Sequence, residues 1–391
     1  MKTFPTLYKR AKSGEVLLWW MDYKPETGEY RTCSCQKNGK VKIKAWTQPE
    51  AKNVGKSNAS TPQSQGLTEI EAKYVQQRKD HYFDSEKDID RKLFFVPMLA
   101  EKFADVADKI IYPAFMQRKF NGIRCINHGE GYAENGAGAF SRTGEEFFCI
   151  DHIKEEIEDI LNRFPRALTD GELFKYGVPL NEIASLVSVN TKLKDVTPER
   201  LEKAKRIIEY HIYDGFGFFG VTQESPFSER HEALKSLLKD YTYLKAVETF
   251  KVNSNKEAKA LLDRFLKEKY EGGILRIDDP YYNDRCDSLI KMKKFHDEEY
   301  EVVDILASKK GDWGGKAKKI VCRLPAGSGK DGASTFESNI RGTMPEMEKL
   351  FKEKDRHIGK MATVTYQELS PYGVPLIPYT ELPFRDYETK K

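Results

Sequence analysis

The sequence predicts an α+β protein with three consecutive parts, and one observation supports each part. Residues 1–95 are basic and contain strand-like runs joined by a hairpin signal. Residues 96–296 alternate strand-like runs with amphipathic helical runs. Residues 297–391 return to strand-like runs, which we expect to form a small β-barrel. With 391 residues, of which 39% are hydrophobic, the chain can form two or three domains with real cores.

The first part, residues 1–95, is predicted to be a small β-rich module with one helix. Its hairpin signal is the pair Asn38-Gly39, because this dipeptide suits the tight turn between antiparallel strands. Residues 67–83 have helical character, and the charged stretch 84–92 ends the module. We expect strands at 14–23, 29–36 and 41–46, followed by a polar, turn-rich stretch at 47–66.

The middle part, residues 96–296, carries apolar residues at helical spacing between short runs that are typical of strands. Residues 115–129 are expected to form a hairpin-like pair of strands. The other expected strands are 166–174, 210–216, 272–279 and 288–295, and the expected helices are 152–164, 230–241 and 255–270.

The last part, residues 297–391, has three strand-like runs, at 299–308, 319–327 and 360–370. A glycine-rich loop with five lysines and one aspartate, residues 309–319, separates the first two runs. Short strands separated by turn-rich loops are typical of small barrels.

Charge is distributed unevenly along the chain. Residues 1–60 contain 12 lysines and arginines against 5 acidic residues, although the whole chain has a net charge of only +4. A basic end indicates contact with a polyanion, but a merely solvated basic face has the same composition. The six cysteines form no C-x-x-C pair, which argues against a zinc site or a disulfide framework. Because no run approaches the roughly 20 apolar residues of a membrane span and no signal segment opens the chain, we expect a soluble protein of a cytoplasm-like compartment.

Residues suited to catalysis recur along the middle part. The run KFNGIR begins at Lys119 and ends at Arg124, and Arg142 follows in SRTG. Asp170 and Glu172 in DGEL share one face of a strand, because strand side chains alternate. Each feature alone is ordinary, since alternating charges usually mark a solvated face. The other candidate catalytic residues of the middle part are Tyr213 and Asp214 in IYDGF, Glu271 and Arg276 in EGGILRI, and Lys291 and Lys293 in KMK.

Together, and in this order, these motifs resemble those of the covalent nucleotidyltransferases, most closely the ATP-dependent DNA ligases of compact phage and viral type. The lysine motif of that family is K-x-D-G-x-R, which KFNGIR matches except at Asn121. SRTG, DGEL, IYDGF, EGG and KMK resemble the family's further motifs. The resemblance covers residues 96–391. It implies an adenylation domain over 96–296, which is a nucleotidyltransferase fold of ATP-grasp-like type, and an OB-fold barrel over 297–391.

The resemblance also implies a role for each motif residue. Lys119 would carry AMP covalently, Tyr213 would stack on adenine, and Gln117 would contact the adenine edge. The implied catalytic residues are Lys119, Arg124, Lys291 and Lys293. The implied ATP-binding residues are these four with Gln117, Arg142, Glu172, Tyr213, Glu271 and Arg385. The implied cofactors are ATP and Mg²⁺, with Mn²⁺ as an alternative ion, and the implied metal ligands are Glu271, Glu172 and Asp170.

The chemistry of nucleotidyl transfer requires residues of these types. A lysine amine must be neutral to attack a phosphate, and neighbouring cations with partial desolvation lower its pKa. The transition state spreads charge over phosphoryl oxygens, which cations stabilise. Carboxylates suit Mg²⁺, because this ion prefers oxygen ligands.

The sequence therefore predicts an ATP-dependent DNA ligase that seals nicks between a 5′-phosphate and a 3′-hydroxyl in duplex DNA. The family resemblance implies a monomer, located in the host cytoplasm if the source is a phage or virus. An RNA ligase or an mRNA-capping guanylyltransferase would use the same lysine chemistry. A non-catalytic nucleic-acid-binding protein on a ligase scaffold is a further alternative, because Asn121 and Leu376 depart from the family pattern.

Residues 1–95 lie outside the resemblance. Their basic charge and the pair Trp19-Trp20 predict a module that grips DNA. Strand alternation directs only one of the two tryptophans into the core, which leaves the other for a partner.

Overall fold

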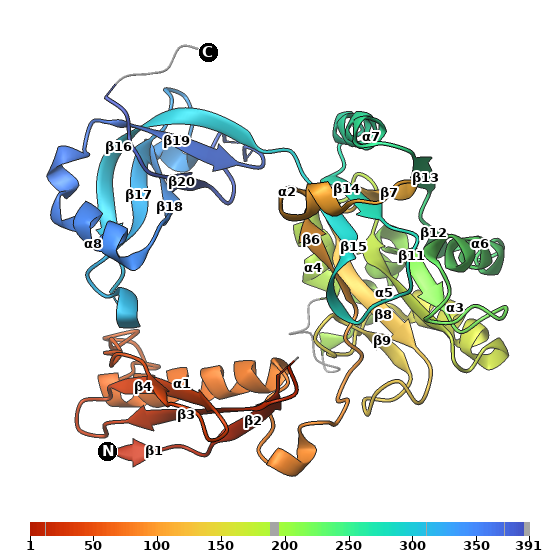
Figure 1. Cartoon of the computed structure of the whole chain (residues 1–391), viewed down its shortest axis with the longest axis horizontal. Helices are drawn as coiled ribbons and strands as arrows, with labels where there is room; N and C mark the ends of the chain where they lie inside the picture. Colours follow the sequence, from red (N-terminus) through yellow and green to blue (C-terminus); the bar gives the residue numbers. More distant parts are fainter. Residues whose placement is uncertain (12, 188–194, 310, 371, 387–391) are drawn as a thin grey trace. The chain divides into compact units, whose positions relative to one another are not determined.

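The computed structural model describes residues 1–11, 13–187, 195–309, 311–370 and 372–386. The chain forms two compact units, one of Met1–Asp90 with Lys294–Lys391 and the other of Arg91–Lys293 (Figure 1). The division into domains 1–95, 96–296 and 297–391 stays a prediction. Among the described residues, no helix combines the length and the apolar character needed to cross a membrane.

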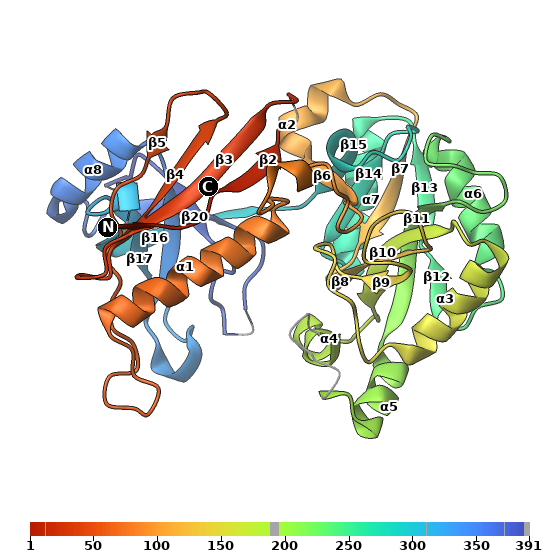
Figure 2. The same cartoon turned by 90° about the horizontal axis from the view of Figure 1, so that it is seen from below.

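The N-terminal part of the first unit is a sheet with a long helix along one face (Figures 1 and 2). The strands pair in the order β1–β3–β4–β5, with β2 beside β3. Trp19 is buried against Tyr74 of the helix at a ring distance of 4.8 Å, whereas Trp20 is half-buried. One tryptophan thus faces the core, as strand alternation predicts. The elements are β1 (Lys2–Thr3), β2 (Leu7–Arg10), β3 (Val16–Tyr23), β4 (Tyr30–Gln36), β5 (Lys42–Ile43) and α1 (Pro62–Lys79).

Helix α1 begins at Pro62 rather than at residue 67, so the predicted turn-rich stretch 47–66 is wrong at its end. The Thr61 hydroxyl accepts the Ser64 backbone N–H at 3.2 Å, and the Ser64 hydroxyl accepts the Thr61 N–H at 2.9 Å. Pro62 occupies the first helical position, where the helix has no hydrogen-bond partner for the N–H that proline lacks. This reciprocal cap starts the helix before its apolar residues begin, and apolar periodicity therefore misses the first turn.

The C-terminal part of the first unit contains a closed barrel with the strand order β16–β17–β18–β20–β19, which confirms the predicted barrel. Its core includes Val302, Ile320 and Val364, and helix α8 adds Met347 and Leu350. The sequence does not predict β18, β20 or α8. The elements are β16 (His296–Ala307), β17 (Ala317–Arg323), β18 (Thr335–Arg341), α8 (Met344–Lys352), β19 (Met361–Tyr366) and β20 (Tyr379–Glu381).

The second unit contains two five-stranded sheets flanked by helices, which confirms the α+β class. The first sheet has the order β12–β11–β10–β8–β9 and the second has the order β13–β7–β14–β15–β6. The first comprises β8 (Ile123–His128), β9 (Gly138–Phe140), β10 (Leu168–Phe174), β11 (Glu209–Phe216) and β12 (Leu244–Ala246). The second comprises β6 (Met98–Lys102), β7 (Ala114–Lys119), β13 (Thr249–Val252), β14 (Gly272–Arg276) and β15 (Asp284–Met292).

Helices of the second unit cover the sheets through apolar stripes. Helix α3 buries Ile153, Ile157 and Ile160, which follow the helical spacing that predicts it. Helices α6 and α7 are also predicted, whereas α2, α4 and α5 are not. The helices are α2 (Phe103–Val106), α3 (Asp151–Arg163), α4 (Leu180–Val187), α5 (Pro198–Ile207), α6 (Phe227–Leu237) and α7 (Asn255–Lys267).

Strands β7 and β8 follow each other in the chain but belong to different sheets, so the hairpin predicted over 115–129 is wrong. β7 pairs with β13 and β14, and β8 pairs with β9 and β10. In the connection between them, a Cβ at Gly122 would lie 2.5 Å from the Leu173 carbonyl oxygen, so the close passage requires glycine. As a result, Lys119 ends a strand of one sheet, while Arg124 is the second residue of a strand in the other.

Candidate active site

A cavity of about 280 Å³ in the second unit is lined by residues from both sheets. Glu271 and Asp170 do not line it but bond to residues that do, and Lys293, which does not line it either, bonds to Glu271. Convergence of side chains from two sheets on one cavity is the usual arrangement of a ligand site. The residues predicted from the sequence that line it are Gln117, Lys119, Arg124, Arg142, Glu172, Tyr213, Arg276 and Lys291.

Lys119 and Lys293 share the carboxylate of Glu271. The Nζ atom of Lys119 donates to one carboxylate oxygen, and that of Lys293 donates to the other. Burial would raise the pKa of Glu271, but the two ammonium groups outweigh burial and lower it. Glu271 is therefore ionised at neutral pH and pairs with both amines.

Arg124 is held in place by hydrogen bonds to protein groups. Its Nε donates to Asp170 Oδ1 at 2.9 Å and its Nη2 donates to the Met98 carbonyl at 2.7 Å. The Tyr281 hydroxyl donates to Asp170 Oδ2 at 2.7 Å, and Asp170 is fully buried. Both oxygens of Asp170 are thus engaged by protein donors, which suits a residue that orients Arg124.

Glu172 pairs with Arg124 across β10 and β8, and its side chain faces the cavity. Burial raises the pKa of Glu172 to about 7, with Lys119 and Arg124 opposing the rise. The neighbouring charges of Asp170 and Glu271 raise it further. A carboxyl group with this pKa exchanges its proton readily near neutral pH.

Lys291 and Tyr213 complete the cavity wall. Burial lowers the pKa of Lys291, and the cations of Arg285, Lys102 and Lys293 lower it further. The guanidinium groups of Arg124 and Arg276 lie 5.7 and 5.3 Å from the centre of the Tyr213 ring, within the range of cation–π contact. An aromatic ring that lines a cavity is suited to stack against a flat base.

The donor set gives mixed support to the implied Mg²⁺. Among the described residues, no group of three or more His, Cys, Asp and Glu side chains could hold a metal ion. Glu172 and Glu271 are close enough to affect each other's charge, and Mg²⁺ commonly uses one or two carboxylates together with substrate phosphates and water. Glu172 therefore suits the ion. The oxygens of Asp170 are occupied by protein donors, and Glu271 would have to release Lys119 or Lys293 to bind the ion.

Arg385 belongs to the other compact unit. It donates to Glu299 at 3.2 Å, and its backbone pairs with that of Met361. Its predicted contact with the pyrophosphate stays a prediction.

Sequence reasoning missed residues behind the cavity, of which Arg230 is the clearest example. Arg230 is 1% exposed and lies on the buried side of α6, between Phe227 and Leu234. A charged residue on an apolar helical stripe was the available signal, because such a residue needs a buried partner. That partner, Asp214, lies in the IYDGF motif of β11.

Comparison with known proteins identifies the class of this site. The sequence model of the family described as "ATP dependent DNA ligase domain" matches residues 97–293, about half of the chain. The match spans β6 to β15 and thus every strand that lines the cavity. The chain therefore belongs to the ATP-dependent DNA ligase family.

Individual relatives agree with this assignment. The DNA ligase of African swine fever virus is 28% identical over 415 residues, which cover 95% of this chain and 92% of the viral protein. The DNA ligase of Enterobacteria phage T4 is 24% identical over 306 residues, which cover 68% and 62%. The solved structure of a Lig E DNA ligase, 21% identical, covers 75% of this chain and all of its own with a TM-score of 0.55, a similarity of fold. The chain is therefore a DNA ligase that uses ATP.

Proposed function

We propose that Lys119 is the nucleophile of this ligase. Its Nζ would attack the α-phosphorus of ATP, forming a nitrogen–phosphorus bond while pyrophosphate leaves. The supporting observation is the pairing of Lys119 and Lys293 with Glu271 beside a cavity lined by Arg124, Lys291 and other motif residues. Lys119 is the residue in this group that ends a strand next to the open cavity.

The cations around Lys119 act on the reacting phosphate in this proposal. Lys291, Lys293 and Arg124 stabilise the charge that develops on the phosphoryl oxygens. The Lys119 amine attacks in its neutral form, in which its lone pair is free. Mg²⁺, held by Glu172 together with the phosphates, would neutralise further charge on the leaving pyrophosphate.

Two further transfers complete the proposed reaction. An oxygen of the 5′-phosphate at a nick attacks the phosphorus of the adduct, and the Lys119 amine leaves and regains a proton. The 3′-hydroxyl then attacks the 5′-phosphate and releases AMP, which seals the strand. We propose nicked duplex DNA as the substrate, a monomeric enzyme, and a cytoplasmic location, which is the host cytoplasm if the source is a phage or virus.

We also propose that the N-terminal module contacts DNA. The hairpin around Asn38 exposes four lysines, Lys37, Lys40, Lys42 and Lys44. Exposed lysines bind phosphates without reading sequence, which suits an enzyme that acts on any nick.

Intact mass spectrometry after incubation with ATP and Mg²⁺ tests the nucleophile. We expect one AMP on the parent protein, labile in acid as a phosphoramidate is, and none on Lys119→Ala. Lys294→Ala removes an exposed lysine next to Lys293 and is the matched control, which should keep the adduct. An adduct that persists on Lys119→Ala would show that another residue is the nucleophile.

A further inference from the structure

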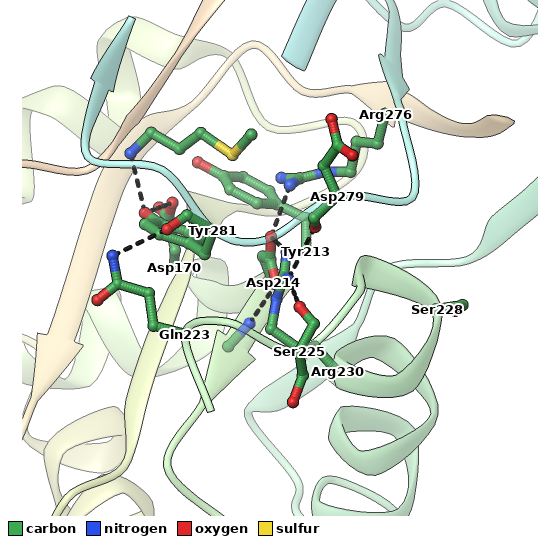
Figure 3. A network of polar contacts seen from close by, with 12 residues as sticks. Asp170, Tyr213, Asp214, Gln223, Ser225, Ser228, Arg230, Arg276, Asp279 and Tyr281 are labelled. Atoms are coloured by element: carbon green, nitrogen blue, oxygen red, sulfur yellow. Dashed lines mark hydrogen bonds and ion pairs between the residues drawn. The ribbon is translucent and has the colours of Figure 1, made fainter. Parts of the chain in front are cut away.

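The Tyr281 hydroxyl belongs to a closed ring of hydrogen bonds behind the cavity. It donates to Asp170 Oδ2 at 2.7 Å (Figure 3) and accepts the Met98 backbone N–H at 3.0 Å. Arg124 donates to Asp170 Oδ1 at 2.9 Å and to the Met98 carbonyl at 2.7 Å, which closes the ring. A phenol has one proton to donate, so the Tyr281 hydroxyl gives its proton to Asp170 and leaves a lone pair for Met98.

The rest of Tyr281 is fixed, so the fold sets the position of its hydroxyl. The residue is 1% exposed, and its ring packs against Phe216 and Phe95 at ring distances of 5.3 and 6.1 Å. Its backbone N–H donates to the Gln223 carbonyl at 2.8 Å, and the Gln223 amide donates to the Tyr281 carbonyl at 2.8 Å. Burial and the charge of Asp170 raise the pKa of Tyr281, so the hydroxyl keeps the proton that it donates.

This ring joins the two sheets that line the cavity. Asp170 and Arg124 lie on β10 and β8 of the first sheet. Met98 begins β6 of the second sheet, and Tyr281 lies in the connection from β14 to β15 of that sheet. Lys119 also belongs to the second sheet, at the end of β7. The ring therefore fixes the guanidinium group of Arg124 relative to the sheet that carries the proposed nucleophile.

We propose that Tyr281 is a positioning residue for AMP transfer, which acts by holding Arg124 in the orientation that meets the reacting phosphate. A cation stabilises a developing charge best when its N–H groups already point at the atoms that acquire the charge. Tyr281 does not line the cavity, so it acts through Asp170 and Met98 and not on the nucleotide. The proposal rests on the proposed function, because it requires Arg124 to stabilise the phosphate.

The test is single-turnover transfer of AMP to Lys119 over a series of ATP concentrations, in the full-length protein. Tyr281→Phe keeps the buried ring and removes only the hydroxyl. We expect the maximal rate to fall about tenfold while the ATP concentration at half-maximal rate changes by less than about twofold, because the lost orientation matters in the transition state. Tyr282→Phe changes the exposed neighbour in the same way and is the matched control, which should keep the parent rate.

A double-mutant cycle distinguishes a positioning role from a general loss of structure. Arg124→Lys keeps a positive charge beside the buried Asp170 but loses the planar pair of donors that the ring orients. If Tyr281 acts through Arg124, Tyr281→Phe should cost less than about twofold in the Arg124→Lys background. Rate losses that multiply in the double variant, or a parent-like rate in Tyr281→Phe alone, would overturn the proposal.

Gln223→Met keeps the test decisive if Tyr281→Phe does not fold. It leaves the hydroxyl in place but removes the amide that holds the Tyr281 carbonyl, and it should slow the transfer about threefold in the parent and not in Arg124→Lys. Equal slowing in both backgrounds, or none in either, would overturn the proposal. A parent-like rate in Arg124→Lys alone would overturn the role of Arg124 and the proposal with it, so a failure of the proposed function can be told apart from a failure of Tyr281.

Discussion

Lys119, the last residue of β7, lies directly opposite Gly272, the first residue of β14. Gly272 has a φ of 157°, and a Cβ there would lie 2.3 Å from the Met292 carbonyl oxygen. The backbones of β14 and β15 therefore approach closely at this point. Glu271 precedes Gly272 and Lys293 follows Met292, so this close approach brings the carboxylate of Glu271 to the amine of Lys293.

Substitution of Gly272 by alanine should damage both folding and catalysis. The added Cβ must push β15 away from β14, which we expect to destabilise the protein by about 2 kcal/mol and to slow AMP–lysine formation at least about tenfold. Urea unfolding and the rate of adduct formation measure the two effects. Gly220→Ala is the control, because Gly220 also has a positive φ but no atom within 4 Å of the new Cβ. Similar effects in both variants would mean that the loss of stability and of adduct formation comes from backbone conformation alone.

The stability of the protein should fall as Glu172 ionises. Burial raises the pKa of Glu172 from 4.5 to about 7. Because the folded state binds this proton more tightly than the unfolded chain does, the stabilisation is complete below pH 4.5 and is lost as the pH rises through 7. We expect Glu172→Gln, which stays neutral, to lose less stability than the parent between these pH values. Urea unfolding without nucleotide, repeated across this pH range, checks the prediction. It would be contradicted if the free energy of unfolding varied with pH in the same way in the parent and in Glu172→Gln.

Replacement of Asn121 by aspartate should leave adduct formation within about twofold of the parent. Asn121 is exposed in the connection between β7 and β8 and does not line the cavity. An aspartate there adds a charge in water, where charges act weakly on distant groups. Single-turnover rates of adduct formation measure the effect. A large acceleration would mean that the family's aspartate contributes charge to the reaction.

The exposed lysines of the N-terminal hairpin should contribute to DNA affinity and not to adduct formation. We expect the double variant Lys40→Glu/Lys42→Glu to bind nicked duplex more weakly and to reduce the salt slope of binding by about 2, since each phosphate contact contributes about 0.9. Adduct formation with ATP should be unchanged, because the cavity belongs to the other unit. The matched control is Lys256→Glu/Lys259→Glu on α7, which makes the same change in net charge. Equal losses of DNA affinity in both double variants would attribute the effect to net charge alone.

Local sequence was sufficient to predict some helices but not the pairing of the strands. Helices α3, α6 and α7 follow from apolar residues at helical spacing, because each buries one face. The pairing of β7 with β14 could not be predicted in the same way. Strand pairing depends on residues distant in the chain, and a glycine such as Gly122 suits both a hairpin turn and a crossover between sheets.

By itself, the sequence determined the class of this protein and the set of chemical groups at its site, because its motifs occur in the order typical of one family and nucleotidyl transfer requires residues of these types. Only the tertiary structure decided how buried polar groups pair. Gln117 and Arg276 are 159 residues apart, and their hydrogen bond exists because β7 and β14 are neighbours in one sheet. Asp170 and Asp214 likewise acquire their arginine partners only on folding, since burial makes an unpaired charge too costly to keep.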